Sequence, residues 1–298
     1  MNNDGLIRIR EAMNHIKPAE KNAAVYILEN PEEIVRLSIK ELSNRSGSSQ
    51  AAITRLCKNI GVSGFQDLKL RIAGDLQTSE LNIYNGNEII SDENVNSLIE
   101  KVSQKNIESI RQTLKILEIN SVERAIEALN KANRIDFYGA AASQVIAQDA
   151  QQKFLRINKY CTAYEDAHLQ LTSSVTLREN DVAVGISYSG ETKHVLSAIR
   201  NAKQNNAVTV AITRYGKNTL SELVDIHLCV SSVESDLVRS AATASRIAQL
   251  NIIDILFTGV ASRNYDATIH YLNQTREALQ REFRNPKKRV KRDVYFRN

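Results

Sequence analysis

Asp181-Val-Ala-Val-Gly-Ile-Ser-Tyr-Ser-Gly-Glu-Thr192 is the most informative stretch of this sequence. Its first half is a short apolar run rich in β-branched residues, which is typical of a strand buried on both faces of a parallel sheet. Its second half places the hydroxyls of Ser187, Ser189 and Thr192 around Gly190, and a helical pattern follows directly. We therefore expect a strand, a tight hydroxyl-rich turn and a helix in this order.

This turn has the features of a phosphate site. The first turn of a helix carries unpaired N–H groups and a partial positive charge, so it attracts anions. Hydroxyl side chains and a glycine allow backbone donors to surround a phosphate group. We predict that Ser187, Ser189, Gly190 and Thr192 bind the phosphate of a ligand. The alternative is that they are ordinary turn and N-cap residues.

Strands and helices alternate through the second half of the chain. The predicted strands span residues 134–138, 160–164, 181–187, 207–213 and 226–230, and a long helix covers residues 241–260. Such alternation implies an α/β fold with a parallel sheet covered on both faces. Ligands bind such sheets at the carboxyl ends of the strands, where Gly139-Ala-Ala-Ala-Ser143 also falls. The two loops are therefore expected to form one site.

The first part of the chain has the layout of a helix-turn-helix. Ser38 and Glu41 have capping-box spacing, and the helix they begin must end by Gly47. Ser48 or Ser49 then begins a second helix that finishes before Gly61.

The second of these helices has a buried face and a polar face. Its apolar stripe consists of Ile53, Leu56, Cys57 and Ile60, at helical spacing. The opposite face carries Gln50, Ala51, Thr54, Arg55 and Lys58. Residues 40–71 contain six basic and two acidic side chains. These groups suit a DNA major groove. The alternative is a plain helical bundle with a solvated polar face.

A polar segment, residues 78–94, is the predicted linker between these two parts. The predicted domains are a DNA-binding domain at residues 1–77, a ligand-binding domain at 95–272 and a basic tail at 273–298. Residues 284–298 carry seven basic and one acidic side chain. We predict that this end is solvated. The alternative is that it makes non-specific contacts with DNA phosphates.

Composition argues for a cytoplasmic protein without a structural metal or cofactor. The chain has 298 residues, of which 42% are apolar and 24% charged. Its three cysteines and five histidines are scattered, with neither disulfide nor metal spacing. No signal-peptide pattern occurs, and the longest apolar run is too short to span a membrane.

The common catalytic motifs are absent from the sequence: there is no GxGxxG, no P-loop and no GxSxG elbow. Glu191 or Glu234 could act as a general base, although a solvated charge is the simpler interpretation. His168, close to Asp166 in the sequence, is a candidate ligand contact. A capping or structural role for this pair is the alternative.

Taken together, these stretches resemble the RpiR family of bacterial transcription regulators. The likeness covers residues 5–272 and rests on Ser49-Gln-Ala-Ala-Ile-Thr-Arg55, Gly61-Val-Ser-Gly-Phe-Gln-Asp-Leu-Lys69, Ser187-Tyr-Ser-Gly-Glu-Thr192 and Ala242-Thr-Ala-Ser-Arg-Ile-Ala-Gln-Leu250. Regulators of N-acetylmuramic acid 6-phosphate use look most similar, through Asp149-Ala-Gln-Gln-Lys-Phe-Leu-Arg156 and Arg239-Ser-Ala-Ala-Thr243.

The resemblance implies an all-α helix-turn-helix domain joined to a sugar-isomerase (SIS) αβα sandwich with a five-stranded parallel sheet. It also implies double-stranded operator DNA, a phosphorylated sugar effector and a homodimer or homotetramer as partners. The implied DNA-binding residues are Ser49, Gln50, Ala51, Ala52, Thr54, Arg55 and Lys58. The implied effector-binding residues are Gly139, Ser143, Ser187, Ser189, Gly190, Thr192, Glu234 and His168.

The chain departs from the family pattern at two positions. Ala52 stands where the family usually has Thr, so one phosphate or cap contact is expected to be missing. Ala141 stands where the first phosphate loop usually has its second Gly, and its Cβ is expected to narrow the pocket.

Three functions remain open from the sequence. The preferred one is a DNA-binding regulator of sugar catabolism that senses a sugar phosphate and breaks no bond. The second is a phosphosugar isomerase or lyase with Glu234 or Glu191 as base. The third is an adaptor whose helical head binds protein.

Overall fold

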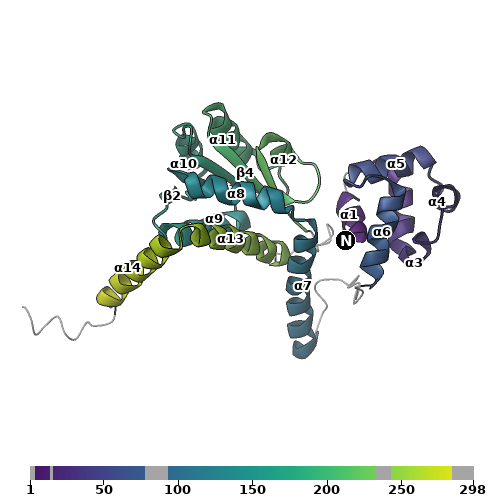
Figure 1. The fold of residues 1–298 in the computed structure, drawn as a ribbon, viewed down its shortest axis with the longest axis horizontal. Coiled ribbons are helices and arrows are strands. Elements are labelled where there is room, and N and C mark those ends of the chain that lie inside the picture. The colour runs from purple at the N-terminus through teal and green to yellow at the C-terminus, as the bar shows by residue number, and fades with distance from the viewer. Residues whose placement is uncertain (1–3, 14–15, 78–92, 232–242, 284–298) are drawn as a thin grey trace, which may run out of the picture.

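The computed structural model describes residues 4–13, 16–77, 93–231 and 243–283, and it contains a helical head and a sheet domain (Figure 1). The described residues of the head, 4–13 and 16–77, form six helices: α1 (Gly5–Ala12), α2 (Pro18–Glu29), α3 (Pro31–Ile34), α4 (Ile39–Ser46), α5 (Gln50–Asn59) and α6 (Phe65–Gln77). Where this chain is described, no helix is both long and apolar enough to cross a membrane.

The helix-turn-helix is confirmed as α4 and α5. The Ser38 side chain accepts from the Glu41 N–H and the Glu41 carboxylate accepts from the Ser38 N–H, which completes the predicted capping box. Gly47 ends α4 with a φ of +65°, a conformation that costs glycine little. Ser49, rather than Ser48, then caps α5. The predicted apolar stripe of α5 lies in the core of the head.

The sheet domain, residues 93–283, has five parallel strands in the order β2-β1-β3-β4-β5. The strands are β1 (Ile135–Tyr138), β2 (Cys161–Thr162), β3 (Val182–Ile186), β4 (Val208–Arg214) and β5 (Ile226–Val230). The predicted strands are therefore confirmed, although β2 is reduced to two residues. Its continuation, Ala163 and Tyr164, leads directly into the loop before the next helix.

Helices cover both faces of this sheet, as expected for alternating strands and helices. The helices of the domain are α7 (Val95–Ile116), α8 (Ile119–Lys131), α9 (Ala142–Leu155), α10 (Ala167–Ser174), α11 (Lys193–Gln204), α12 (Thr219–Leu223), α13 (Thr243–Arg263) and α14 (Tyr265–Phe283). Strand residues Val182, Val184 and Ile186 pack with α8, α9 and α13. Ala183, which points the other way, packs with α11 and α12.

Helices α13 and α14 form the carboxyl-terminal part of the described chain. The small residues of α13 are largely buried within the chain, against α7, α8 and α9. Helix α14 continues past the predicted boundary at residue 272 and projects from the sheet domain (Figure 1). Residues 78–92 of the predicted linker and 284–298 of the predicted tail lie outside the described residues.

Candidate effector site and DNA-binding face

The two predicted ligand loops leave neighbouring strands. Strands β1 and β3 pair in parallel, with Ile135 opposite Val182 and Tyr138 opposite Gly185. The loops at residues 139–143 and 187–192 follow the carboxyl ends of these strands and therefore lie side by side. In a sheet of order 2-1-3-4-5 the chain changes direction between β1 and β3, which is where such folds place their ligands. The two loops thus form one candidate site.

The second loop, residues 187–192, is organised by its own hydroxyls. The Ser187 and Thr192 hydroxyls are 2.8 Å apart, and the Gly190 N–H donates to Ser187 Oγ at 3.2 Å. Ser189 Oγ accepts from the Glu191 N–H at 3.2 Å. Ser187 is buried, whereas Ser189 and Thr192 are half-buried. Ser187 therefore holds the turn, and the side chains of Ser189 and Thr192 stay partly exposed. The phosphate role of all three stays a prediction.

The first loop brings strand β1 very close to helix α9. A Cβ on Gly139 would lie 2.6 Å from the Ser143 carbonyl oxygen, so only glycine fits. Ala141 has a φ of +48°, a left-handed conformation that favours glycine, and its side chain is exposed. Ala141 therefore adopts the positive φ that a glycine would adopt at this position of the loop. Ser143 lies half-buried in the first turn of α9.

Two residues that the sequence did not single out tie the first loop to the neighbouring helices. Gln170 on α10 is fully buried, and its Nε2 donates to the Gly139 carbonyl at 2.9 Å. His194 on α11 places Nε2 3.4 Å from the same carbonyl. Helix α11 begins directly after the second loop, so His194 bridges the two loops. Nothing in the local pattern distinguishes these two residues, because their partner is a backbone oxygen far away in sequence.

The predicted acid Glu191 holds a neighbouring helix, and the predicted ligand contact His168 is exposed. Glu191 accepts hydrogen bonds from the Thr219 N–H at 2.8 Å and the Thr219 hydroxyl at 2.7 Å, so its carboxylate holds the start of α12. Asp166 caps α10 by accepting from the Leu169 N–H, and His168 is exposed on that helix. The ligand role of His168 stays a prediction. Glu234 lies outside the described residues.

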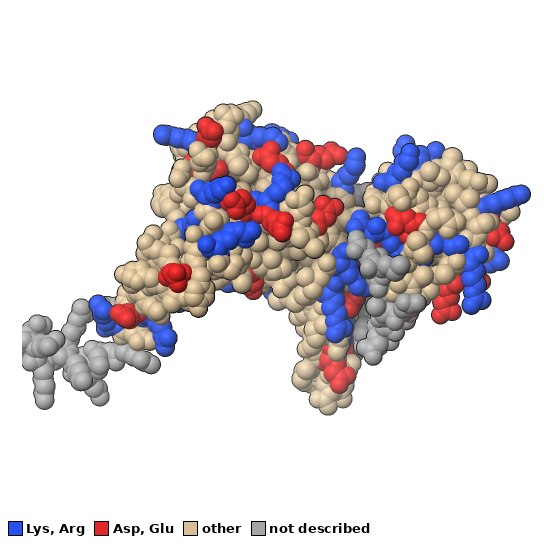
Figure 2. Space-filling model, in the orientation of Figure 1, with Lys and Arg blue, Asp and Glu red and all other residues tan. Residues whose placement is uncertain are grey.

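Helix α5 presents the predicted DNA-binding face. Gln50, Ala51, Thr54, Arg55 and Lys58 are all exposed, and basic side chains lie over this helix (Figure 2). The side chain of the N-cap residue Ser49 accepts from the Ala52 N–H at 3.2 Å.

Including Ala52 among the DNA contacts was wrong, because its side chain is fully buried in the head. Ala52 lies one residue before Ile53, on the side of α5 that packs into the core. It cannot reach DNA with its side chain.

Glu20 on α2, which the sequence did not single out, lies beneath α5 and contacts two of its side chains. It is 1% exposed, and it accepts from Asn59 Nδ2 at 2.8 Å and faces Arg55 Nε at 3.4 Å. Arg55 nevertheless keeps a side chain that is 54% exposed. Glu20 therefore engages the Nε edge of the guanidinium, while more than half of the Arg55 side chain stays exposed.

We expect Glu20→Gln to weaken operator binding about 3- to 10-fold, because the neutral amide orients Arg55 and Asn59 less firmly. Fluorescence anisotropy with labelled duplex DNA measures this. Glu32→Gln, at an exposed position of α3, is the matched control, since it removes the same charge from the head. Equal or tighter binding by Glu20→Gln would show that Glu20 competes with DNA for Arg55.

Burial shifts the pKa of four side chains that could otherwise act as nucleophiles, bases or metal ligands. Burial raises the pKa of Cys57 to about 11 and of Cys161 and Cys229 to about 12, so these thiols stay protonated at neutral pH. Burial also lowers the pKa of His227 to about 4. Among the described residues, no group of three or more His, Cys, Asp or Glu side chains could hold a metal ion.

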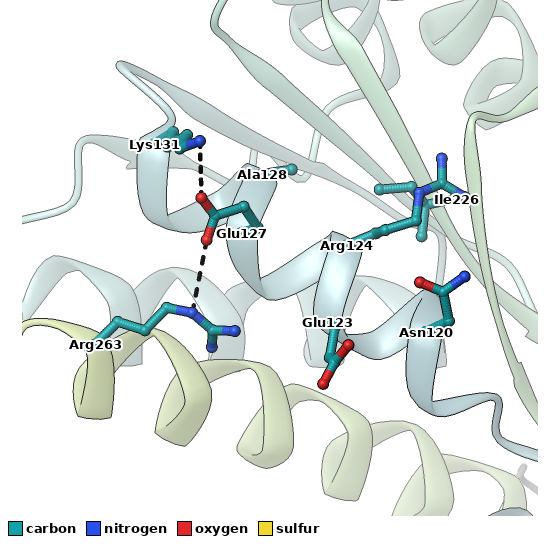
Figure 3. Close-up of a pocket in the computed structure, with 8 residues that line it drawn as sticks. All are labelled: Asn120, Glu123, Arg124, Glu127, Ala128, Lys131, Ile226 and Arg263. Carbon is teal, nitrogen blue, oxygen red and sulfur yellow. Dashed lines mark ion pairs between the residues drawn. The ribbon is translucent and has the colours of Figure 1, made fainter.

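An open cavity of 630 Å³ lies away from this site, between α8, α13 and the amino end of β5 (Figure 3). Its cations are already engaged: Lys131 and Arg263 pair with Glu127, and Arg124 donates to the Asp225 carbonyl. It lies at the amino ends of the strands, whereas the two loops follow the carboxyl ends. The cavity therefore offers a phosphate no cation that lacks a protein partner, and it does not support phosphate binding there.

Two family descriptions match the two parts of the chain. Residues 3–79 match a helix-turn-helix domain of the rpiR family, and residues 128–259 match a SIS domain. An uncharacterized HTH-type transcriptional regulator of Caldanaerobacter subterraneus is 47% identical over 93% of this chain and 97% of its own length. The HTH-type transcriptional regulator RpiR of Escherichia coli is 32% identical over 77% of this chain and 76% of its own length.

A solved structure also matches almost the whole chain. The Vibrio vulnificus NanR protein complexed with ManNAc-6P superimposes with a TM-score of 0.60 at 25% identity. The match covers 94% of this chain and 100% of that structure. The likeness therefore includes both the helical head and the sheet domain.

Proposed function

Because the chain belongs to the RpiR family of transcriptional regulators, we propose that α5 reads an operator in double-stranded DNA while the two loops of the SIS domain sense a sugar phosphate. The sensed compound would be a phosphorylated amino sugar, and the regulated genes would serve its catabolism. Such a regulator would act in the cytoplasm, where both ligands occur.

One observation carries this proposal: the two loops leave neighbouring strands at the same edge of the sheet, and His194, in the first turn of the helix that follows the second loop, lies 3.4 Å from the Gly139 carbonyl of the first. Ser189 and Thr192 offer half-buried hydroxyls there, and α9 and α11 begin beside them. Hydroxyls and helix N-termini together suit a phosphate dianion. Among the described residues, no carboxylate of these loops is left as an evident base, because Glu191 holds α12.

We propose N-acetylated hexosamine 6-phosphates as the effector class. The NanR structure contains ManNAc-6P, and the sequence resembles regulators of N-acetylmuramic acid 6-phosphate use. The test is a melting panel that contains both compounds, glucosamine 6-phosphate, glucose 6-phosphate and all four unphosphorylated parents. At 100 times its dissociation constant, a true effector adds about 2.7 kcal/mol of stability, or roughly 5–11 °C.

Ser189→Ala should remove this shift without lowering the melting temperature of the free protein by more than about 2 °C, because Ser189 is half-buried and bonds only locally. Ser262→Ala, at an exposed serine of α13, is the matched control and should keep the full shift. Equal shifts from phosphorylated and parent sugars, or a full shift in Ser189→Ala, would contradict the phosphate site.

We propose further that the SIS domain binds its ligand without converting it. Incubating the protein with each phosphate of the panel and separating the products by chromatography tests this point. Isomerised or cleaved sugar phosphate that is lost in Ser189→Ala would favour the isomerase or lyase alternative instead.

Self-association of the chain would place the heads of two copies on two half-sites of the operator DNA. Helix α7 projects from the sheet domain (Figure 1), and its first turns expose the apolar side chains of Val95, Leu98, Ile99 and Val102. We propose that a second copy of the chain covers these side chains in a dimer or tetramer. Half-sites would then lie about 34 Å apart, or a multiple of this distance.

A further inference from the structure

Helix α1 contacts the rest of the head with one side and the sheet domain with the other. Leu6, Ile9 and Ala12 lie in the core of the head. Ile7 instead forms a small buried cluster with Ile116 and Cys229 of the sheet domain. The two parts of the chain therefore share a packed contact, here called the seam.

Tyr215 lies at the centre of the polar contacts in the seam. Its hydroxyl accepts from Arg8 Nη1 at 2.7 Å and donates to the Ile60 carbonyl at 3.1 Å. Arg8 Nη1 also donates to the Ile60 carbonyl, at 3.2 Å, and its guanidinium lies 5.5 Å from the centre of the Tyr215 ring. Ile60 ends α5. A side chain of the sheet domain thus bonds directly to the end of the DNA-reading helix.

The seam continues at the end of β5. Ser231 Oγ donates to Glu11 Oε1 of α1 at 3.0 Å, and its N–H donates to Thr113 of α7. Burial raises the pKa of the Tyr215 phenol, although the Arg8 cation opposes this effect. The hydroxyl therefore keeps its proton at neutral pH and remains a donor to Ile60.

Tyr215 also belongs to the segment that holds the second ligand loop. On one side of it, the Arg214 N–H donates to the Tyr188 carbonyl at 2.9 Å. On the other side, the Leu220 N–H donates to the Gly190 carbonyl at 3.1 Å, and Thr219 bonds to Glu191. Loop 187–192 and segment 213–220 are therefore joined on both sides of Tyr215.

We propose that Tyr215 is a positioning residue for the DNA-reading helix α5. Through Tyr215, ligand binding at loop 187–192 changes the orientation of α5 relative to the sheet domain. This inference rests on the proposed function. A ligand that draws the loop toward its phosphate moves segment 213–220 with it, because the two are bonded on both sides of Tyr215. The Tyr215 hydroxyl then shifts against Arg8 and Ile60. By linkage, DNA on α5 changes the affinity of the loop for the sugar phosphate by the same factor.

Hydrogen exchange measured by mass spectrometry tests this route without knowledge of the operator. The full-length protein is compared with and without each sugar phosphate of the melting panel. In the wild type, we expect the ligand to slow exchange in residues 187–192 and to change exchange in residues 50–62 about fivefold or more. Tyr215→Phe keeps the ring beneath Arg8 and removes only the hydroxyl. It should retain the protection of residues 187–192 and lose the change in residues 50–62.

Two further variants make the result specific. Tyr265→Phe removes a phenol that is 66% exposed on α14 and should behave as the wild type. Arg8→Gln removes the other partner of the contact and should reproduce the loss seen in Tyr215→Phe. An unchanged response of residues 50–62 in Tyr215→Phe would overturn the inference and leave the proposed function standing. No protection of residues 187–192 in the wild type would instead overturn the proposed function, and this inference with it.

Discussion

Replacing Gly190 with alanine is expected to abolish the melting shift produced by sugar phosphate and to destabilise the free protein by about 2–4 kcal/mol. Gly190 has a φ of +72°, and a Cβ placed on it would overlap the side-chain amide of Asn218. Asn218 cannot move aside, because its Nδ2 donates to Thr213 and its Oδ1 accepts from the Ser221 N–H. The loop must therefore shift and lose the bond between the Gly190 N–H and Ser187.

Differential scanning fluorimetry with the sugar-phosphate panel measures both effects. The expected loss of stability corresponds to a fall in melting temperature of roughly 4–16 °C. Gly47→Ala is the matched control, since Gly47 also has a positive φ, +65°, but a Cβ added to it would meet no atom within 4 Å. It should cost about 1 kcal/mol and keep the ligand shift. A normal ligand shift in Gly190→Ala would show that this loop does not bind the phosphate.

Arg55→Ala is expected to weaken operator binding by about 1–3 kcal/mol, which is roughly 5- to 150-fold. The buried carboxylate of Glu20 contacts Arg55 Nε at 3.4 Å and so orients this cation on the exposed face of α5. The salt dependence of binding then separates two roles. A phosphate contact lowers the slope of log affinity against log salt by about 1, whereas a base contact leaves the slope and relaxes specificity at one position.

Anisotropy titrations with a selected operator and with a scrambled duplex, at several salt concentrations, measure these quantities. Arg178→Ala is the control, because it removes an exposed arginine just before β3, at the amino edge of the sheet, whereas the head contacts residues that follow β4 and β5. It should leave affinity and slope unchanged. If Arg55→Ala bound operator as the wild type does, α5 would not be the DNA-reading helix, and the adaptor interpretation would regain support.

Local rules of the sequence were sufficient for most of the fold. The capping box at Ser38, the apolar stripe of α5 and the strand that ends before Ser187 are each set by residues within one or two turns of each other. The same rules placed both loops at the carboxyl ends of their strands. Pairing of β1 with β3 then confirmed that the loops are neighbours.

The wrong inclusion of Ala52 shows where periodicity alone fails. A helical wheel separates two faces of α5, but the width of the buried face depends on what packs against it. Here the packing of the head buries Ala52 as completely as Ile53. The same packing brings Glu20 beneath Arg55, across 35 positions of the chain.

The sequence by itself determined where the strands and most of the helices lie and which hydroxyls follow the buried strand, because backbone preferences and periodicity act over a few residues. Only the tertiary structure decided that Gln170 and His194 meet at the Gly139 carbonyl and that Tyr215 meets Ile60. These contacts join positions between 31 and 155 residues apart. They depend on strand order and on the docking of the head, which close packing of the whole chain imposes and no local pattern records.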